Sequence, residues 1–181
     1  MTSVNGNDGD ILVSCFDNVD WIRVEGKGSF KNSAKVKEFT QRNFAKGHRN
    51  FVVDLENCPA VDSTFMGTLA SMALKLRYEP DGRIDIINAN ERTRGSLTSL
   101  GLHCLLELDD DGTTWQAERK LVEKNLTKPM TYDDTDLDKR ETTAHVLTAH
   151  EALVEANAEN YSRFKDVLEY LKDDLNADES T

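Results

Sequence analysis

Apolar and polar positions alternate along the N-terminal part of the chain in a pattern that predicts strands and helices in turn. Two short runs, 11–16 and 21–24, are rich in β-branched and aromatic residues and flank a polar segment, so they predict a β-hairpin. The segment 31–46 has apolar residues at helical spacing and is followed by Gly47, a residue typical of helix ends. The continuous apolar run 51–55 predicts a strand that is buried on both faces.

The alternation then continues with two further helices and two further strands. An apolar helix with Asp62 and Ser63 at its N-cap position is expected to run to about Tyr78, before a Pro-Asp-Gly turn. The later elements are a strand, a short helix and a strand, at 83–87, 90–100 and 104–108. The order ββαβαβαβ predicts an α/β fold in which a mixed β-sheet of about five strands packs against helices.

The C-terminal part of the chain has helical patterns only. A segment with capping-box spacing, 113–116, precedes a short helix that places Trp115, Val122 and Leu126 on one face. A polar linker at 130–138 follows. This region therefore predicts an extension of the α/β domain that is connected to it through a short helix.

A single long helix is expected from Lys139 to about Leu175, because no glycine or proline interrupts this segment. Apolar residues recur there every seven positions, as in a coiled-coil seam, at Leu147, Val154, Tyr161, Leu168 and Leu175, with Phe164 and Leu171 at the companion spacing. The companion positions nearer its start are polar, at His150 and Asn157. Two interpretations stay open: the helix folds back onto its own domain, or it joins two chains as a homodimer.

Most of the excess negative charge lies in residues 133–181, which include this predicted helix. The chain has 33 acidic and 22 basic side chains and a formal net charge of -11, and residues 133–181 hold 14 of the acidic and 5 of the basic ones. We therefore divide the chain into a domain at 1–111, a short helix and linker at 112–138, and a long acidic helix at 139–181. Proteins that bind nucleic acid do so with a surplus of Lys and Arg, so we expect no nucleic acid partner.

The sequence also has no apolar window of the length that a membrane span needs, and its N-terminus does not resemble a signal peptide. We expect no membrane partner and a cytoplasmic location.

The three cysteines show no C-x-x-C spacing, and the four histidines follow no metal-ligand spacing. His145 and His150 are five positions apart, which places them on different faces of a helix. The segment 134–138 imitates the start of a calcium loop but lacks its glycine and final glutamate. From the sequence we therefore expect no metal site, no bound cofactor and no enzymatic activity.

One stretch does carry a recognisable motif. An apolar strand ending in Asp54-Leu55 is followed by a short loop and then by the helix start at 62–67, Asp-Ser-Thr-Phe-Met-Gly. Together with the segments 24–30 and 97–102, this pattern resembles the STAS domain of bacterial anti-sigma factor antagonists over about residues 9–110. The family motif has glycine where this chain has Phe65, so the chain departs from it there.

The resemblance implies a function for the start of this helix. In the family, the first serine of the motif is phosphorylated by a partner anti-sigma factor that is itself a serine kinase, and this position falls on Ser63. The implied partner-binding residues are Asp62, Ser63, Thr64, Phe65, Met66 and Gly67. The implied function is partner switching: the unmodified chain binds the kinase and releases a sigma factor, phosphorylation ends the binding, and a serine phosphatase resets the protein.

Elementary electrostatics supports such a switch. A phosphate adds about -1.5 to -2 charges and would lie beside the carboxylate of Asp62, which disfavours a protein interface. The N-terminus of a helix tolerates the same anion because its free N–H groups and its dipole stabilise negative charge. The alternative is a STAS scaffold, or a ligand-sensing or transporter-associated subunit, in which Ser63 is only a helix cap. Arg92 and Arg94 are candidates to face a phosphate or an acidic partner, although solvent exposure is the favoured explanation for both.

Overall fold

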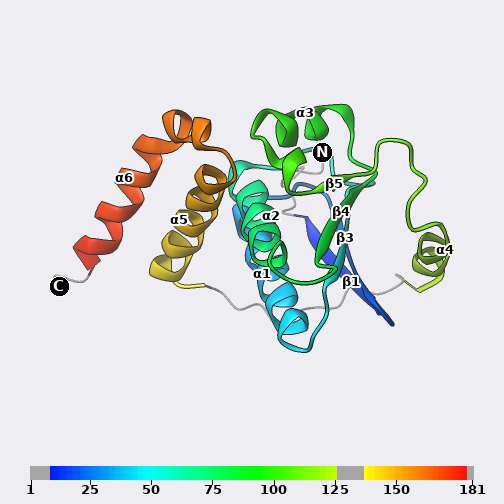
Figure 1. The fold of residues 1–181 in the computed structure, drawn as a ribbon. Helices are drawn as coiled ribbons and strands as arrows, with labels where there is room; N and C mark the ends of the chain where they lie inside the picture. Colours follow the sequence, from blue (N-terminus) through cyan, green and yellow to red (C-terminus); the bar gives the residue numbers. More distant parts are fainter. Residues whose placement is uncertain (1–8, 126–136, 179–181) are drawn as a thin grey trace, which may run out of the picture.

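The structure, a computed structural model, describes residues 9–125 and 137–178 and contains one mixed sheet in that part of the chain (Figure 1). The strands are β1 Asp10–Phe16, β2 Val19–Glu25, β3 Asn50–Asp54, β4 Arg83–Ile87 and β5 Glu107–Leu108. They follow the order β1-β2-β3-β4-β5; β1 and β2 are antiparallel and every later pair is parallel. The predicted hairpin and the predicted α/β class are confirmed.

Three helices cover one face of this sheet. They are α1 Phe30–Ala45, α2 Ser63–Leu76 and α3 Glu91–Ser99. The strand β3 is buried on both faces, as its continuous apolar run predicts. Its residues Phe51 and Val53 belong to the main core beneath these helices, and Val52 belongs to a smaller core on the opposite face. The helix α4 Gln116–Asn125 covers that second face and places Val122 in the smaller core.

The last predicted strand is shorter than expected. Residues Leu102–Cys104 form a 3₁₀ turn (η1) after Gly101, whose φ is +75°, and only the two residues of β5 pair with β4. The apolar side chains of this segment nevertheless reach the core, because Leu102 and Leu106 are both buried. The apolar pattern of this segment therefore marks residues that are buried in a turn and not in a strand. The predicted position of Leu126 and most of the predicted linker fall outside the described residues.

The prediction of one long C-terminal helix is wrong. The structure has two helices, α5 Lys139–Ala156 and α6 Tyr161–Asp178, joined by a 3₁₀ turn at Ala158–Asn160 (η2). Asn157 is extended (φ -152°, ψ 114°), and its side-chain oxygen accepts a hydrogen bond from the Glu159 backbone N–H. Asparagine competes in this way with helical hydrogen bonding, so it ends α5 without a glycine or proline.

The break is held in place by contacts with the α/β domain. Asn160 is buried and donates hydrogen bonds to the carbonyls of Leu100 (2.9 Å) and Leu153 (2.8 Å). A Cβ on Gly101 would lie 2.9 Å from the side-chain nitrogen of Asn157, so the turn packs directly on this glycine. The predicted coiled-coil seam is therefore divided between two helices.

The two C-terminal helices form an antiparallel hairpin against the domain. In Figure 1, α5 lies along α2, and α6 lies on the far side of α5 from the sheet. Ion pairs join Lys139 to Asp174 and Glu151 to Lys172, each at 3.2 Å. Leu153 of α5 is fully buried in the main core. The open question about the extension is thus answered: it folds back onto its own domain.

We expect Leu153→Ala to lower the free energy of unfolding by about 2–5 kcal/mol, because the substitution leaves a cavity where α5 meets the domain core. The matched control is Leu121→Ala in α4, where the leucine is 46% exposed and little buried surface is lost. Urea denaturation of both variants measures the difference. Equal, small changes in the two variants would mean that α5 is not part of the folded core.

Candidate functional site

Ser63 is the first residue of α2, and Asp62 is its N-cap. The two carboxylate oxygens of Asp62 serve two helices: Oδ1 accepts from the backbone N–H of Phe65 at 2.8 Å, and Oδ2 accepts from that of Phe30 at 2.9 Å. Phe30 is the first residue of α1. A single negative charge therefore lies at the positive ends of two helix dipoles, which stabilises it and fixes the start of α2.

The remaining residues of the predicted partner-binding segment point inward or lie under another helix. Thr64, Phe65, Met66 and Gly67 are all buried, whereas Asp62 and Ser63 are half-buried. Phe65 is fully buried in the main core, and a Cβ on Gly28 would lie 3.1 Å from its ring. The large residue at this motif position thus fills the core beside the Gly28 loop and is not exposed beside the serine.

The hydroxyl of Ser63 contacts the C-terminal extension. Its Oγ lies 3.1 Å from Nε2 of His150 in α5. The other ring nitrogen, Nδ1, lies 2.8 Å from the carbonyl oxygen of Val146, which can only accept a hydrogen bond. In the neutral ring Nδ1 therefore carries the proton, and the Ser63 hydroxyl donates to Nε2. The ring of Phe164 in α6 packs edge-on against the imidazole, with 5.1 Å between the ring centroids.

Gly67 allows the backbone of α5 to lie very close to α2. A Cβ built on Gly67 would lie 2.2 Å from the carbonyl oxygen of Ala149 and 2.9 Å from the Ala149 Cβ. No side chain larger than hydrogen fits between the two helices at this level. Gly67 is one turn after Ser63 on α2, and Ala149 precedes His150 on α5. The glycine contact and the serine contact are therefore parts of one interface.

A second histidine bridges α5 to α1. Nε2 of His145 lies 2.8 Å from Oγ of Ser33. Burial, and after it the positive charge of Lys37, lowers the pKa of His145 from 6.5 to about 4, so the ring is neutral at neutral pH. The two histidines are about 140° apart around α5, as the sequence indicates. Both still face the domain, because α5 contacts α1 with one side and α2 with the other.

Nothing in the sequence points to these two histidine contacts, because they join residues that are 112 and 87 positions apart. A serine hydroxyl against an imidazole is also the beginning of a nucleophile-and-base arrangement. However, neither Ser63 nor His150 lines either of the two cavities described for this chain. Within residues 9–125 and 137–178, no group of three or more His, Cys, Asp or Glu side chains is arranged to hold a metal ion. The geometry is that of a packed contact between helices.

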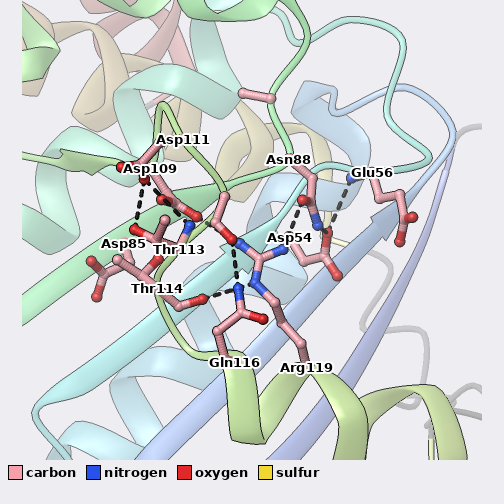
Figure 2. Close-up of polar contacts among 12 residues, drawn as sticks. Asp54, Glu56, Asp85, Asn88, Asp109, Asp111, Thr113, Thr114, Gln116 and Arg119 are labelled. Atoms are coloured by element: carbon pink, nitrogen blue, oxygen red, sulfur yellow. Dashed lines mark hydrogen bonds and ion pairs between the residues drawn. The ribbon is translucent and has the colours of Figure 1, made fainter.

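The aspartate of the Asp-Leu motif lies in a separate polar network at the carboxyl ends of the strands (Figure 2). Asp54 is fully buried and is held by an ion pair with Arg23 at 2.7 Å and a hydrogen bond from Asn88 at 2.8 Å. Asn88 in turn accepts from Arg119 of α4 at 2.8 Å, and Arg119 pairs with Asp109 at 2.6 Å. This network connects α4 to the sheet, so its charges are paired within the fold.

The two arginine candidates lie in α3. Arg94 forms an ion pair with Asp110 at 2.8 Å, and Arg92 is exposed. Solvent exposure and a surface ion pair account for both. None of the helices in the described part of the chain is both long and apolar enough to cross a membrane.

Comparison with solved structures and with family models agrees with this fold. An anti-sigma factor antagonist from Mycobacterium paratuberculosis is 20% identical, with a TM-score of 0.51 over 67% of this chain and 99% of that one. A Thermotoga maritima protein assigned as an anti-sigma factor antagonist is 16% identical, with a TM-score of 0.52 over 62% of this chain and 94% of that one. A search of curated protein sequences found no match.

The family itself follows from the sequence match. Residues 11–115 match the family model of the STAS domain, and the chain belongs to the STAS domain family. The match includes Ser63 and Gly67 and ends before α5 and α6. The helix α5, which covers the start of α2, and the helix α6 therefore lie outside the matched STAS domain.

We expect Gly67→Ala to lower the free energy of unfolding by about 1–3 kcal/mol, because the new methyl group would overlap the α5 backbone. The control is Gly95→Ala in α3, where a Cβ meets no atom within 4 Å. That variant should gain up to about 1 kcal/mol from the better helix propensity of alanine. Chemical denaturation gives both values, and a stabilising effect of Gly67→Ala would show that α5 does not lie on α2.

The lowered pKa of His145 predicts a pH dependence. The folded protein favours the neutral ring, so its contribution to stability is present above about pH 6.5 and is lost as the pH falls toward 4. We expect the wild type to lose more stability over this range than His145→Gln, which cannot be protonated. His103→Gln, at an exposed position, is the control and should follow the wild type. Urea titrations at several pH values test this, and parallel curves for the wild type and His145→Gln would contradict it.

Proposed function

We propose that this chain is a bacterial STAS-domain regulator that binds a serine-kinase anti-sigma factor, and that phosphorylation of Ser63 by that kinase ends the binding. The observation that carries the proposal is the position of Ser63. It is the first residue of α2, next to the capping carboxylate of Asp62, in a chain that belongs to the STAS family. A serine phosphatase would reverse the modification. The chain acts in the cytoplasm as a binding protein and not as an enzyme.

The electrostatics at the start of α2 supports a switch at this serine. Asp62 already occupies the N-termini of α1 and α2 with one negative charge. A phosphate on Ser63 would add up to about two more charges next to it, and a partner that buries this surface would have to desolvate them all. The free N–H groups of the first helical turn keep the modified domain folded. Phosphorylation would therefore weaken the complex more than it weakens the fold.

The extension adds a second level of control to this proposal. His150 Nε2 lies 3.1 Å from Ser63 Oγ, so a phosphate placed on Oγ in the direction of this hydrogen bond would overlap the imidazole of α5. A kinase must also surround the hydroxyl to transfer a phosphoryl group to it. Phosphorylation and partner binding at this surface therefore require α5 to move away. Because only the open form is competent, the apparent affinity for the kinase falls in proportion to the population of that form.

The proposed partner surface is accordingly the start of α2 after α5 has moved. Ser63, Asp62, Thr64 and Gly67 would contribute to it, and Met66 lies beside them on the same helix. The Phe65 side chain would act indirectly by holding the loop at Gly28. We do not propose a homodimer through the C-terminal helices. The apolar residues Leu153 of α5 and Leu168 and Leu171 of α6 are already buried within one chain and are not available to a second copy.

A second candidate function is that of a ligand-sensing STAS subunit without phosphorylation. A cavity between α5 and the domain favours this candidate. The two functions are compatible, since a ligand that changes the position of α5 would also change access to Ser63.

The direct test is phosphorylation of the full chain. We expect a serine-kinase anti-sigma factor from the native organism, incubated with ATP, to place phosphate on Ser63, as mapped by mass spectrometry. Ser63→Ala should abolish the modification, whereas Ser99→Ala, at an exposed serine of α3, should not change it. Phosphate found elsewhere on the chain, with Ser63 unmodified, would rule out the proposed switch.

The rate of Ser63 phosphorylation tests whether α5 covers the serine. Leu153→Ala weakens the docking of α5 without altering the motif, and a loss of about 2 kcal/mol, the lower end of the loss expected for this substitution, corresponds to an increase of about 30-fold in the open population. We expect Ser63 to be phosphorylated faster by about that factor, with Leu121→Ala as the unchanged control. Equal rates in both variants would exclude α5 as a cover and would leave the assignment of Ser63 itself untouched.

A further inference from the structure

A cavity of about 160 Å³ lies between α1, α2 and α5. Its wall is mostly apolar and includes Phe44, Phe51, Met72, Leu76 and Ala149. An apolar cavity of about 150 Å³ is large enough to hold benzene, so this one has room for a compact apolar group. It is lined by three helices and β3, and it adjoins the interface that covers Ser63.

Two lysines give this cavity a positive charge. Lys37 of α1 and Lys75 of α2 both line it, and no acidic residue does. Burial lowers the pKa of Lys37, and the charge of Lys75 lowers it further, so the two ammonium groups are near enough to repel each other. Among the ion pairs within the described residues, none involves either lysine. In a chain with a net charge of -11, this is a local concentration of unpaired positive charge.

These features define the chemistry of a ligand. An apolar body would fill the space along Phe44 and Met72, and an anionic head group would lie at the two lysines. A carboxylate there would relieve the repulsion between the ammonium groups and would compensate the burial of Lys37. The nearby His145 is neutral and is already bonded to Ser33, so it adds no competing charge.

We propose that this cavity binds a small monocarboxylic acid whose apolar body has about six to eight carbon atoms, with its carboxylate between Lys37 and Lys75. The site is built partly from the extension, because His145, Thr148 and Ala149 of α5 form one of its walls. A bound acid contacts α5 and the α/β domain at the same time. By mass action it therefore stabilises the closed position of α5.

Octanoate is a suitable probe for calorimetric titration of the full chain. We expect saturable binding of one molecule per chain. Lys37→Met and Lys75→Met should each weaken it at least about tenfold, since each removes one of the two charges that pair with the carboxylate. Both side chains reach solvent, so these variants should fold. Lys120→Met, at an exposed lysine of α4, is the matched control and should bind as the wild type does.

Three related compounds separate the contributions of charge and apolar surface. Octanol lacks the charge, octylammonium reverses it, and acetate lacks the apolar body, so all three should bind at least about tenfold more weakly than octanoate. Equal binding of octanol and octanoate would overturn the proposal, because the lysines would then have no role. Unchanged octanoate binding by Lys37→Met and Lys75→Met would overturn it as well.

Hydrogen exchange tests the coupling to the extension. Saturating octanoate should slow amide exchange in α5 and leave exchange in α4, on the opposite face of the sheet, unchanged. Binding that leaves α5 exchange unaffected would show that the acid does not occupy the cavity between α5 and the domain. None of these measurements involves a kinase or a phosphate on Ser63. A negative result here therefore bears on the cavity alone, and a failure of Ser63 phosphorylation leaves the cavity proposal standing.

Discussion

The close contact of α5 with α2 at Gly67 is the constraint on which the functional part of this structure depends. Because position 67 has no side chain, the backbone of Ala149 comes within a distance that any Cβ would prevent. That approach brings His150 to Ser63, places Leu153 in the core and closes the apolar cavity over Met72. A single methyl group at Gly67 would disturb all three, so this glycine determines both the packing of α5 and the contact that covers Ser63.

The start of α2 combines a structural and a chemical role. Asp62 caps two helices at once, so the backbone around Ser63 is fixed whether or not α5 is present. The serine hydroxyl can therefore lose its partner His150 without loss of local structure, because the cap does not depend on it. The proposed switch needs this separation: a movement of α5 or a phosphate on Ser63 would change the surface, while the helix beneath would stay the same.

The extension folds back by contacts that are both apolar and polar. Leu153 and the small residues of α5 bury apolar surface, while two serine-histidine pairs satisfy polar groups inside the interface. Buried polar groups must keep their partners, so the interface has one well-defined register. Because the folded protein favours the neutral ring of His145, the stability of this interface depends on pH. A small anion bound in the lysine-lined cavity would also stabilise the docked position of α5. Each acts on the same element, α5, and through it on access to Ser63.

The sequence determined most of the α/β domain by itself. Strand and helix patterns, the caps at Asp62 and Asn90 and the Asp-Ser-Thr motif are local, and they place the sheet, α2 and Ser63 to within a few residues. The sequence did not determine the extension. Periodicity alone predicts one helix at 139–175. The side-chain hydrogen bond of Asn157 that ends α5 does not interrupt the apolar pattern, and the contacts that hold the turn on Gly101 and Leu100 are distant in sequence. The same reason applies to the covered serine, since only the folded chain brings His150 to Ser63 and places the two lysines at the lining of one cavity.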